Sequence, residues 1–215
     1  ILPGGAEDEA WREAVQAFAD HDAVRGKVVW NVSELTSHGI SDAYRRRRAD
    51  MANSAAANAL AAAIGDYVWD QASGELSRLR YLVILGDDRI VPFHRANIEP
   101  VDGLDLQWLG EEHYYDSGFL RGSSSTGSAL LDGLTLTDDP YGAPRSTIPS
   151  ALDRFGVRVP VLPVGRLVET PQQMTALLEQ FVAGDGVIDV RRSLVAGYDF
   201  MEDGAASADA ALAAA

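Results

Sequence analysis

The most constraining feature of this sequence is an apolar run that stops abruptly at glycine and aspartate. Residues 79–85 read Leu-Arg-Tyr-Leu-Val-Ile-Leu and are followed by Gly86, Asp87 and Asp88. An almost uninterrupted apolar run of roughly four to eight residues is typical of a parallel strand that is covered on both faces. The run therefore predicts a buried parallel strand and places the chain in the α/β class.

Helix-like and strand-like segments alternate along the rest of the chain. We expect helices over 7–20, from about 49 to 70 and from 171 onward, and strands over 27–32, 157–164 and 192–197. The arginines at 45–48 are expected to lie in the lead-in to the second helix, because a basic run at a helix N-terminus opposes the helix dipole. We interpret them as a solvated face or as local partners of the many aspartates. Two prolines make 157–164 an edge strand or an irregular one. Residues 97–135 show no period and predict a long surface loop.

This alternation predicts a mostly parallel sheet flanked by helices. In such sheets ligands bind beyond the carboxyl ends of the strands. The positions to weigh there are Asp87, Asp88, Asp138, Asp139, Arg166 and Asp199. The first residues read as the end of a strand, and the Ala-rich last residues read as the start of a helix, so we expect a chain that is truncated at both ends.

Charge and cysteine content exclude several classes of function. The 215 residues include 32 acidic and 18 basic side chains, a formal net charge of −14, and no cysteine. Disulfides, zinc–thiolate sites and a cysteine nucleophile within the chain are thereby excluded. A strongly acidic chain is a poor partner for nucleic acid, and no apolar run reaches the roughly 20 residues of a membrane span. Cytoplasmic and secreted locations both stay open.

Three aspartates after strands are candidates for an Mg²⁺ site. Asp87, Asp88 and Asp139 offer the oxygen ligands that this ion prefers. The competing interpretation is that they cap turns, and we favour it for Asp87 and Asp88 because no phosphate-binding glycine loop accompanies them. The four histidines lack the spacing of a metal site, so we expect structural roles for His21, His38, His94 and His113, with His21 facing solvent.

The segment Asp138-Asp139-Pro140-Tyr141-Gly142 is a strong turn signal. It either forms an Asx-type turn or holds a carboxylate at the floor of a pocket. A buried carboxylate strongly prefers a cationic partner. The pocket interpretation therefore predicts a basic ligand for this turn.

Several segments, in this order, resemble the gingipain-like cysteine peptidases, which have a caspase-like fold. They are Tyr81-Leu82-Val83-Ile84-Leu85-Gly86-Asp87, Thr137-Asp138-Asp139-Pro140-Tyr141-Gly142, Pro163-Val164-Gly165-Arg166-Leu167 with the helix that follows, and Leu194-Val195-Ala196-Gly197-Tyr198-Asp199. The family pattern is a strand that ends L-x-G-D, an S/T-D-x-x-Y-G turn, and an I/V-G-R-L/F segment after a strand, followed by a helix. The resemblance covers roughly residues 25–205.

The resemblance implies a division of labour within a larger peptidase. Residues 1–190 would form the first α/β subdomain and 191–215 the start of an incomplete caspase-like subdomain. The catalytic histidine and cysteine would lie beyond this chain, which would be inactive alone. Asp138, in the turn that contains Tyr141, would bind a basic side chain, so these two residues are the expected substrate-binding residues and cleavage is expected after Arg or Lys.

The expected partners are a peptide or protein substrate and the remainder of the parent protein. No cofactor is expected to be required, although the resemblance allows calcium binding by loop carboxylates. Two other functions stay open. One is a non-catalytic scaffold or interaction domain related to these peptidases. The other is a magnesium-dependent α/β hydrolase that uses Asp87, Asp88 and Asp139.

Overall fold

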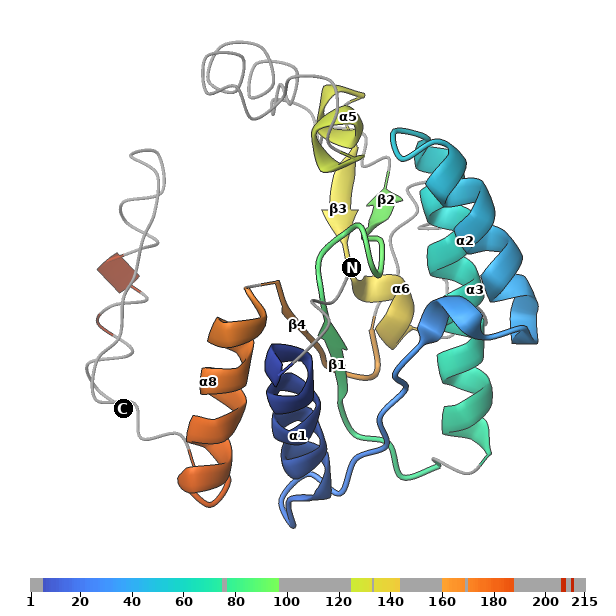
Figure 1. The fold of residues 1–215 in the computed structure, drawn as a ribbon. Coiled ribbons are helices and arrows are strands. Elements are labelled where there is room, and N and C mark those ends of the chain that lie inside the picture. Colours follow the sequence, from blue (N-terminus) through green and yellow to red (C-terminus); the bar gives the residue numbers. More distant parts are fainter. Residues whose placement is uncertain are drawn as a thin grey trace. The chain divides into compact units, whose positions relative to one another are not determined.

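The structure is a computed structural model, which describes residues 6–74, 77–96, 125–132, 134–143, 160–168 and 170–187, and the single positions 206, 207 and 210. The chain divides into two compact units, each described by itself below. One is Val29–Thr170, and the other combines Ile1–Val28 with Pro171–Ala215. Elements are labelled as in Figure 1. The expected boundary at residue 190/191 falls outside the described residues and stays a prediction.

The unit that combines the two chain ends is built on two packed helices, α1 (Ala6–Asp20) and α8 (Pro171–Ala183). The rings of Phe18 and Phe181 meet edge to face, with 5.1 Å between their centroids. Met174 and Leu178 of α8 are buried. Both helices are thus confirmed close to their expected bounds, because apolar residues recur at helical spacing in each.

The Val29–Thr170 unit begins with the 3₁₀ turns η1 (Val32–Glu34) and η2 (Ser37–Gly39), then helices α2 (Ile40–Ala49) and α3 (Ser54–Ser73), which pack side by side (Figure 1). The expected lead-in position of the arginine run was wrong. Arg46, Arg47 and Arg48 lie in the last turn of α2, where a cation favours the helix dipole. Asn53 caps α3 by accepting a hydrogen bond from the backbone N–H of Ala56.

Two small sheets follow. Strand β1 (Leu82–Leu85) pairs in parallel with β4 (Val164–Leu167), with Ile84 opposite Arg166. Strand β2 (His94–Ala96) pairs antiparallel with β3 (Thr135–Thr137). The parallel pairing of β1 is confirmed, and the α/β class with it. Burial on both faces is not, because Ile84 is 6% exposed whereas Val83 is 43% exposed.

Three further expectations need correction. Residues 27–32 form no strand: 27–31 run without regular structure and Val32 begins η1. The expected loop over 97–135 contains helix α5 (Ser125–Leu131) and the start of β3. The Asp-Pro-Tyr-Gly turn is a single helical turn, α6 (Asp139–Gly142). Over 157–164 the irregular alternative is confirmed for 160–163, the part that precedes β4 among the described residues, and Val164 begins β4.

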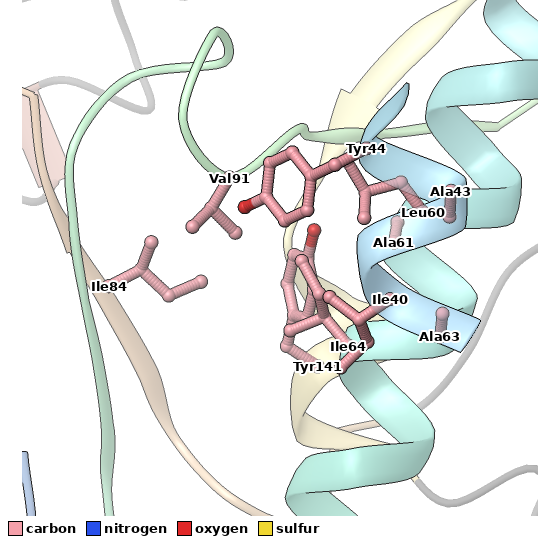
Figure 2. Close-up of a cluster of buried hydrophobic side chains, with 10 residues drawn as sticks. All are labelled: Ile40, Ala43, Tyr44, Leu60, Ala61, Ala63, Ile64, Ile84, Val91 and Tyr141. Atoms are coloured by element: carbon pink, nitrogen blue, oxygen red, sulfur yellow. The ribbon is translucent and has the colours of Figure 1, made fainter. Parts of the chain in front are cut away.

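The core of the Val29–Thr170 unit lies where α2 and α3 face β1 and the loop after it (Figure 2). Two tyrosine rings, Tyr44 of α2 and Tyr141 of α6, stand inside this apolar cluster. The hydroxyl of Tyr44 points toward Val91 (Figure 2). Buried tyrosine hydroxyls need hydrogen-bond partners, and the partners are in the loop after β1.

Candidate functional site

The loop over residues 86–93, called the β1 loop below, leaves the carboxyl end of β1 and is held by side chains from three other elements. Its backbone carbonyls are the acceptors. Tyr44 donates to the carbonyl of Ile90 at 2.5 Å, and Tyr141 donates to that of Pro92. Arg166 of β4 donates through Nη1 to the carbonyls of Gly86 and Val91, at 2.9 and 2.7 Å. Each of these bonds is long-range, so the loop conformation depends on the tertiary fold.

Arg166 also forms a two-bond ion pair with Asp138. Its Nε donates to Oδ2 at 2.8 Å and its Nη2 donates to Oδ1 at 2.5 Å. The guanidinium carbon lies 4.2 Å from the centroid of the Phe93 ring. The Arg166 side chain is 5% exposed and that of Asp138 is 18% exposed. Parallel hydrogen bonds of this kind fix the relative orientation of the two groups.

Three of the four segments on which the family resemblance rests therefore meet at one place, although they are far apart in sequence, and the fourth, 194–199, lies outside the described residues. Gly86 of the first motif, Asp138 of the second and Arg166 of the third are joined directly by hydrogen bonds. Tyr141 ties the second motif to the β1 loop through the carbonyl of Pro92. The three segments are therefore parts of one hydrogen-bonded unit.

Two motif glycines have steric reasons of their own. Gly86 has φ +125°, a left-handed value that disfavours other residues, and a Cβ there would lie 3.0 Å from Ile90 Cδ1. A Cβ on Gly142 would lie 2.3 Å from the carbonyl oxygen of Leu162. The chain that leads into β4 packs directly on this glycine, since the N–H of Leu162 donates to its carbonyl.

A second buried ion cluster centres on Asp88, which is itself a residue of the β1 loop. Arg95 donates to both carboxylate oxygens, at 2.7 and 2.6 Å, and Arg47 donates to Oδ2 at 3.2 Å. The Ser125 hydroxyl and the backbone N–H of Phe93 also donate hydrogen bonds to the Asp88 carboxylate. The side chains of Asp88, Arg95 and Arg47 are 4%, 1% and 3% exposed.

The pKa directions in this cluster follow from its contacts. Burial alone would raise the pKa of the Asp88 carboxyl, but hydrogen bonds from Arg95 and Ser125 outweigh burial, and the pKa lies below its usual value. Burial, together with the charge of Arg95, lowers the pKa of Arg47. The carboxylate therefore holds its negative charge inside the protein, between two cations.

Asp87 and Asp139 are placed differently from Asp88. Asp87 accepts hydrogen bonds from the backbone N–H and the Nε of Arg89, at 2.9 and 2.8 Å. Burial alone would raise the pKa of Asp87, but the bonds from Arg89 lower it. Asp139 begins α6 and donates its backbone N–H to Thr137 Oγ1. The turn-cap interpretation of Asp87 is confirmed by its bond to the Arg89 N–H.

The magnesium hypothesis receives no geometric support from the part of the chain that the structure describes. The carboxylate of Asp88 is enclosed by two guanidinium groups, and that of Asp87 pairs with Arg89. Among the described residues, no group of three or more His, Cys, Asp or Glu side chains is arranged to hold a metal ion.

The two candidate substrate-binding residues differ in access. Asp138 retains some exposure beside Arg166, whereas Tyr141 is 0% exposed. Burial raises the pKa of Tyr141 well above its usual value and raises that of Tyr44 to about 12. The Tyr141 hydroxyl is thus a neutral donor to the Pro92 carbonyl. Their role toward a substrate stays a prediction.

Three of the four histidines, His21, His38 and His94, lie in the described part of the chain. His38, in the left-handed region at φ 56°, pairs through Nε2 with Asp70 Oδ2 at 2.8 Å. His21 was expected to face solvent, but its side chain is 12% exposed and packs on the Phe181 ring. His94 lies in β2. His113 lies outside the described residues, as do Asp199 and the segments expected at 192–197 and, apart from 206, 207 and 210, at 204–215.

Sequence reasoning missed three residues of the Asp88 cluster, namely Arg47, Arg95 and Ser125. Arg47 belongs to a run that was interpreted as a solvated face or as local partners of aspartates, and its pairing with Asp88 agrees with the second alternative. Only the register of α2 buries Arg47 while Arg45 stays exposed. Arg166 was singled out by its place after a strand, but no role followed from that. A usable signal was the number of carboxylates predicted at strand ends, because buried carboxylates require cations.

Comparison of the chain with protein-family models, with curated proteins and with solved structures gives no match. The described helices include none that is both long enough and apolar enough to cross a membrane. Functional inference therefore rests on the geometry above and on the motif resemblance.

Proposed function

We propose that this chain is the first α/β portion of a gingipain-like cysteine peptidase, in which it supplies the framework and a wall of the substrate pocket. The observation that carries the proposal is the meeting of the three motif segments at Arg166. A carboxylate in one motif, a guanidinium in the second and a loop carbonyl in the third form one hydrogen-bonded unit. The finer assignment to a caspase-like fold is part of this proposal.

The chemistry assigned to the whole enzyme needs groups from outside this chain. A cysteine thiolate, activated by a histidine, attacks the scissile carbonyl, and backbone N–H groups hold the oxyanion. These 215 residues contain no cysteine, so the nucleophile belongs to another part of the parent protein. The chain itself orients the substrate, and calcium, where present, would act on loop carboxylates and not in the reaction.

Asp138 is the proposed recognition residue for an Arg or Lys side chain of the substrate. A carboxylate offers about four acceptor positions on its two oxygens, and Arg166 uses one on each oxygen. The 18% exposure of the Asp138 side chain leaves an approach from solvent. Tyr141 contributes indirectly, by fixing the β1 loop beside this carboxylate.

The test uses the parent protein with Asp138→Ala and, as matched control, Asp139→Ala. We expect the first variant to lose its preference for cleavage after Arg or Lys, measured as the ratio of kcat/KM on basic and neutral peptide substrates, and the second to keep it. An unchanged ratio in Asp138→Ala would reject the pocket role. Peptidase activity from the 215-residue chain alone would contradict the proposal as a whole.

One observation favours a second candidate, a non-catalytic scaffold related to these peptidases. Asp138 already has a cationic partner in Arg166, and Tyr141 is fully buried, as in a purely structural cluster. The coding sequence beyond Ala215 separates the two. A downstream histidine and cysteine in the family pattern favour the peptidase, and their absence favours the scaffold.

A further inference from the structure

The group that surrounds the Arg166 guanidinium has the composition of a binding site for arginine. The Arg166 guanidinium donates four hydrogen bonds, two to the Asp138 carboxylate and one each to the carbonyls of Gly86 and Val91. The Phe93 ring covers one face at 4.2 Å. A carboxylate fork, carbonyl acceptors and an aromatic face are the features by which proteins recognise a guanidinium group.

We call this arrangement the guanidinium cradle, formed by Asp138, Phe93 and the carbonyls of Gly86 and Val91. In the structure the cradle is filled by the chain's own Arg166, whose side chain is 5% exposed. The carboxylate that is proposed to attract a basic substrate side chain is therefore neutralised by a residue of the same unit. A second cation would meet an ion pair without net charge, which attracts it only weakly.

The cradle is open on the side of the carboxylate. Asp138 is more exposed than Arg166, at 18% against 5%, so a ligand from solvent reaches the carboxylate before it reaches the arginine. Arg166 enters from β4, which pairs with β1 in the described part of the chain, with Ile84 opposite Arg166. Competition between two guanidinium groups for one carboxylate follows from this geometry.

We propose that Arg166 is an internal competitor for Asp138, which keeps basic side chains out of the cradle until Arg166 is withdrawn from it. This inference rests on the proposed function, because it assumes that Asp138 is the recognition carboxylate. It adds a regulatory element to that site. The chain as it stands binds arginine-like ligands weakly, and removal of the Arg166 guanidinium exposes a cradle that selects arginine over neutral ligands.

The experiment measures binding of Nα-acetyl-L-arginine amide and of methylguanidine to the 215-residue chain by NMR titration. Arg166→Ala empties the cradle, and Arg166→Ala with Asp138→Asn empties it and also removes the carboxylate charge. We expect Arg166→Ala to bind both probes at least tenfold more tightly than the unmodified chain. The double variant should lose that gain, and Nα-acetyl-L-norleucine amide should not bind to any of them.

A second measurement covers the case in which Arg166→Ala folds poorly. Millimolar methylguanidine should then raise its melting temperature, since a ligand that binds only the folded state stabilises it. Methylammonium at the same concentration should not. Arg166→Lys, which keeps the charge but not the planar fork, should show affinity for the probes between that of the unmodified chain and that of Arg166→Ala.

The possible failures are distinguishable. Equal affinity of Arg166→Ala and the unmodified chain for the arginine probe would overturn the competitor role and leave Asp138 as a recognition residue. Absence of binding and of thermal stabilisation in every variant would overturn both the inference and the pocket role of Asp138. If the double variant loses the increase in probe affinity that Arg166→Ala shows, that increase is assigned to the Asp138 carboxylate.

Discussion

Asp88 and Asp138 both pair with arginine, but the two centres differ in how completely they are closed. Asp88 faces two guanidinium groups, a serine hydroxyl and a backbone N–H, and its side chain is 4% exposed. Asp138 faces one guanidinium group, from Arg166, and is 18% exposed. The first centre lies between α2, β2 and α5, whereas the second joins α6 to β4 and the β1 loop.

The difference teaches how a carboxylate at a strand end acquires a role. Where every acceptor position is filled from within, as at Asp88, the group fixes the fold and has no access to a ligand. Where acceptor positions remain beside partial exposure, as at Asp138, the group is placed to recognise a ligand once its own arginine is withdrawn. The predictions below test this contrast, from the largest expected effect to the smallest.

The largest effect is expected for Asp88→Asn, which keeps the shape of the side chain but removes its charge. Two buried guanidinium groups, those of Arg47 and Arg95, would lose the carboxylate that they share. Loss of one partner of a buried ion pair costs about 3–5 kcal/mol. We expect a loss of this size in the free energy of unfolding, measured by urea denaturation at pH 7, and a loss under ~1 kcal/mol would refute the closed-centre interpretation.

The same variant has a pH signature. The folded pKa of Asp88 lies below its usual value, so its stabilising contribution is present above about pH 4, the unfolded value, and is lost as pH falls through the folded value. The stability difference between the unmodified chain and Asp88→Asn should therefore shrink below about pH 4. A difference that stays constant down to pH 3 would show that the charge of Asp88 is not the cause.

Removal of the Tyr141 hydroxyl, in Tyr141→Phe, should have the next largest effect. The buried carbonyl of Pro92 would lose its donor, and an unsatisfied buried acceptor costs about 1–3 kcal/mol. Thermal unfolding measured by circular dichroism is the readout. If the β1 loop is held by Tyr141, amide hydrogen exchange over residues 86–93 should also become faster, while exchange in α1 should be unchanged.

A smaller and pH-dependent effect is expected at Tyr44. Burial raises its pKa to about 12, above the value near 10 of an unfolded tyrosine. Its contribution to stability is complete below about pH 10 and is lost as pH rises from about 10 to 12. Between about pH 10 and 12, the free energy of unfolding of Tyr44→Phe should fall less steeply than that of the unmodified chain. The two slopes should differ by up to about 1.4 kcal/mol per pH unit. Parallel stability curves of the two proteins would contradict this.

The smallest effect is expected for Asp87→Asn. The Arg89 side chain is 79% exposed, and exposed ion pairs contribute about 0–1 kcal/mol. Asparagine keeps an oxygen that accepts the Arg89 backbone N–H, so the cap survives. We expect a change below about 0.5 kcal/mol in urea denaturation at pH 7. A loss comparable to that of Asp88→Asn would break the distinction between the two neighbouring aspartates.

Local pattern was enough to predict α1, α8 and β1. Apolar spacing identifies an amphipathic helix, and a short apolar run before Gly86 identifies a strand, because each depends on neighbours in sequence. The strand expected over 27–32 failed for the complementary reason. A strand exists only where another strand accepts its hydrogen bonds, and sequence period does not supply that partner.

The candidate site was predicted in part. Asp138 and Tyr141 were identified by a turn pattern, and Arg166 by its place after a strand, but their mutual contacts were not. Helix α2, which contains Arg47, was not expected: the helix predicted nearby begins at about residue 49, where α2 ends, so this arginine was placed in a lead-in segment. When a helix is missed, the side chains on its inner face are not recognised as buried, and this concealed the Asp88 cluster.

The sequence by itself determined the α/β class, the acidic character of the chain and the absence of any cysteine nucleophile within these 215 residues. Only the tertiary structure decided which arginine neutralises which aspartate. Ion pairs such as Arg47–Asp88 and Arg166–Asp138 join residues 41 and 28 positions apart. Their partners are chosen by packing geometry and by the high cost of burying an unpaired charge, and neither quantity is local in sequence.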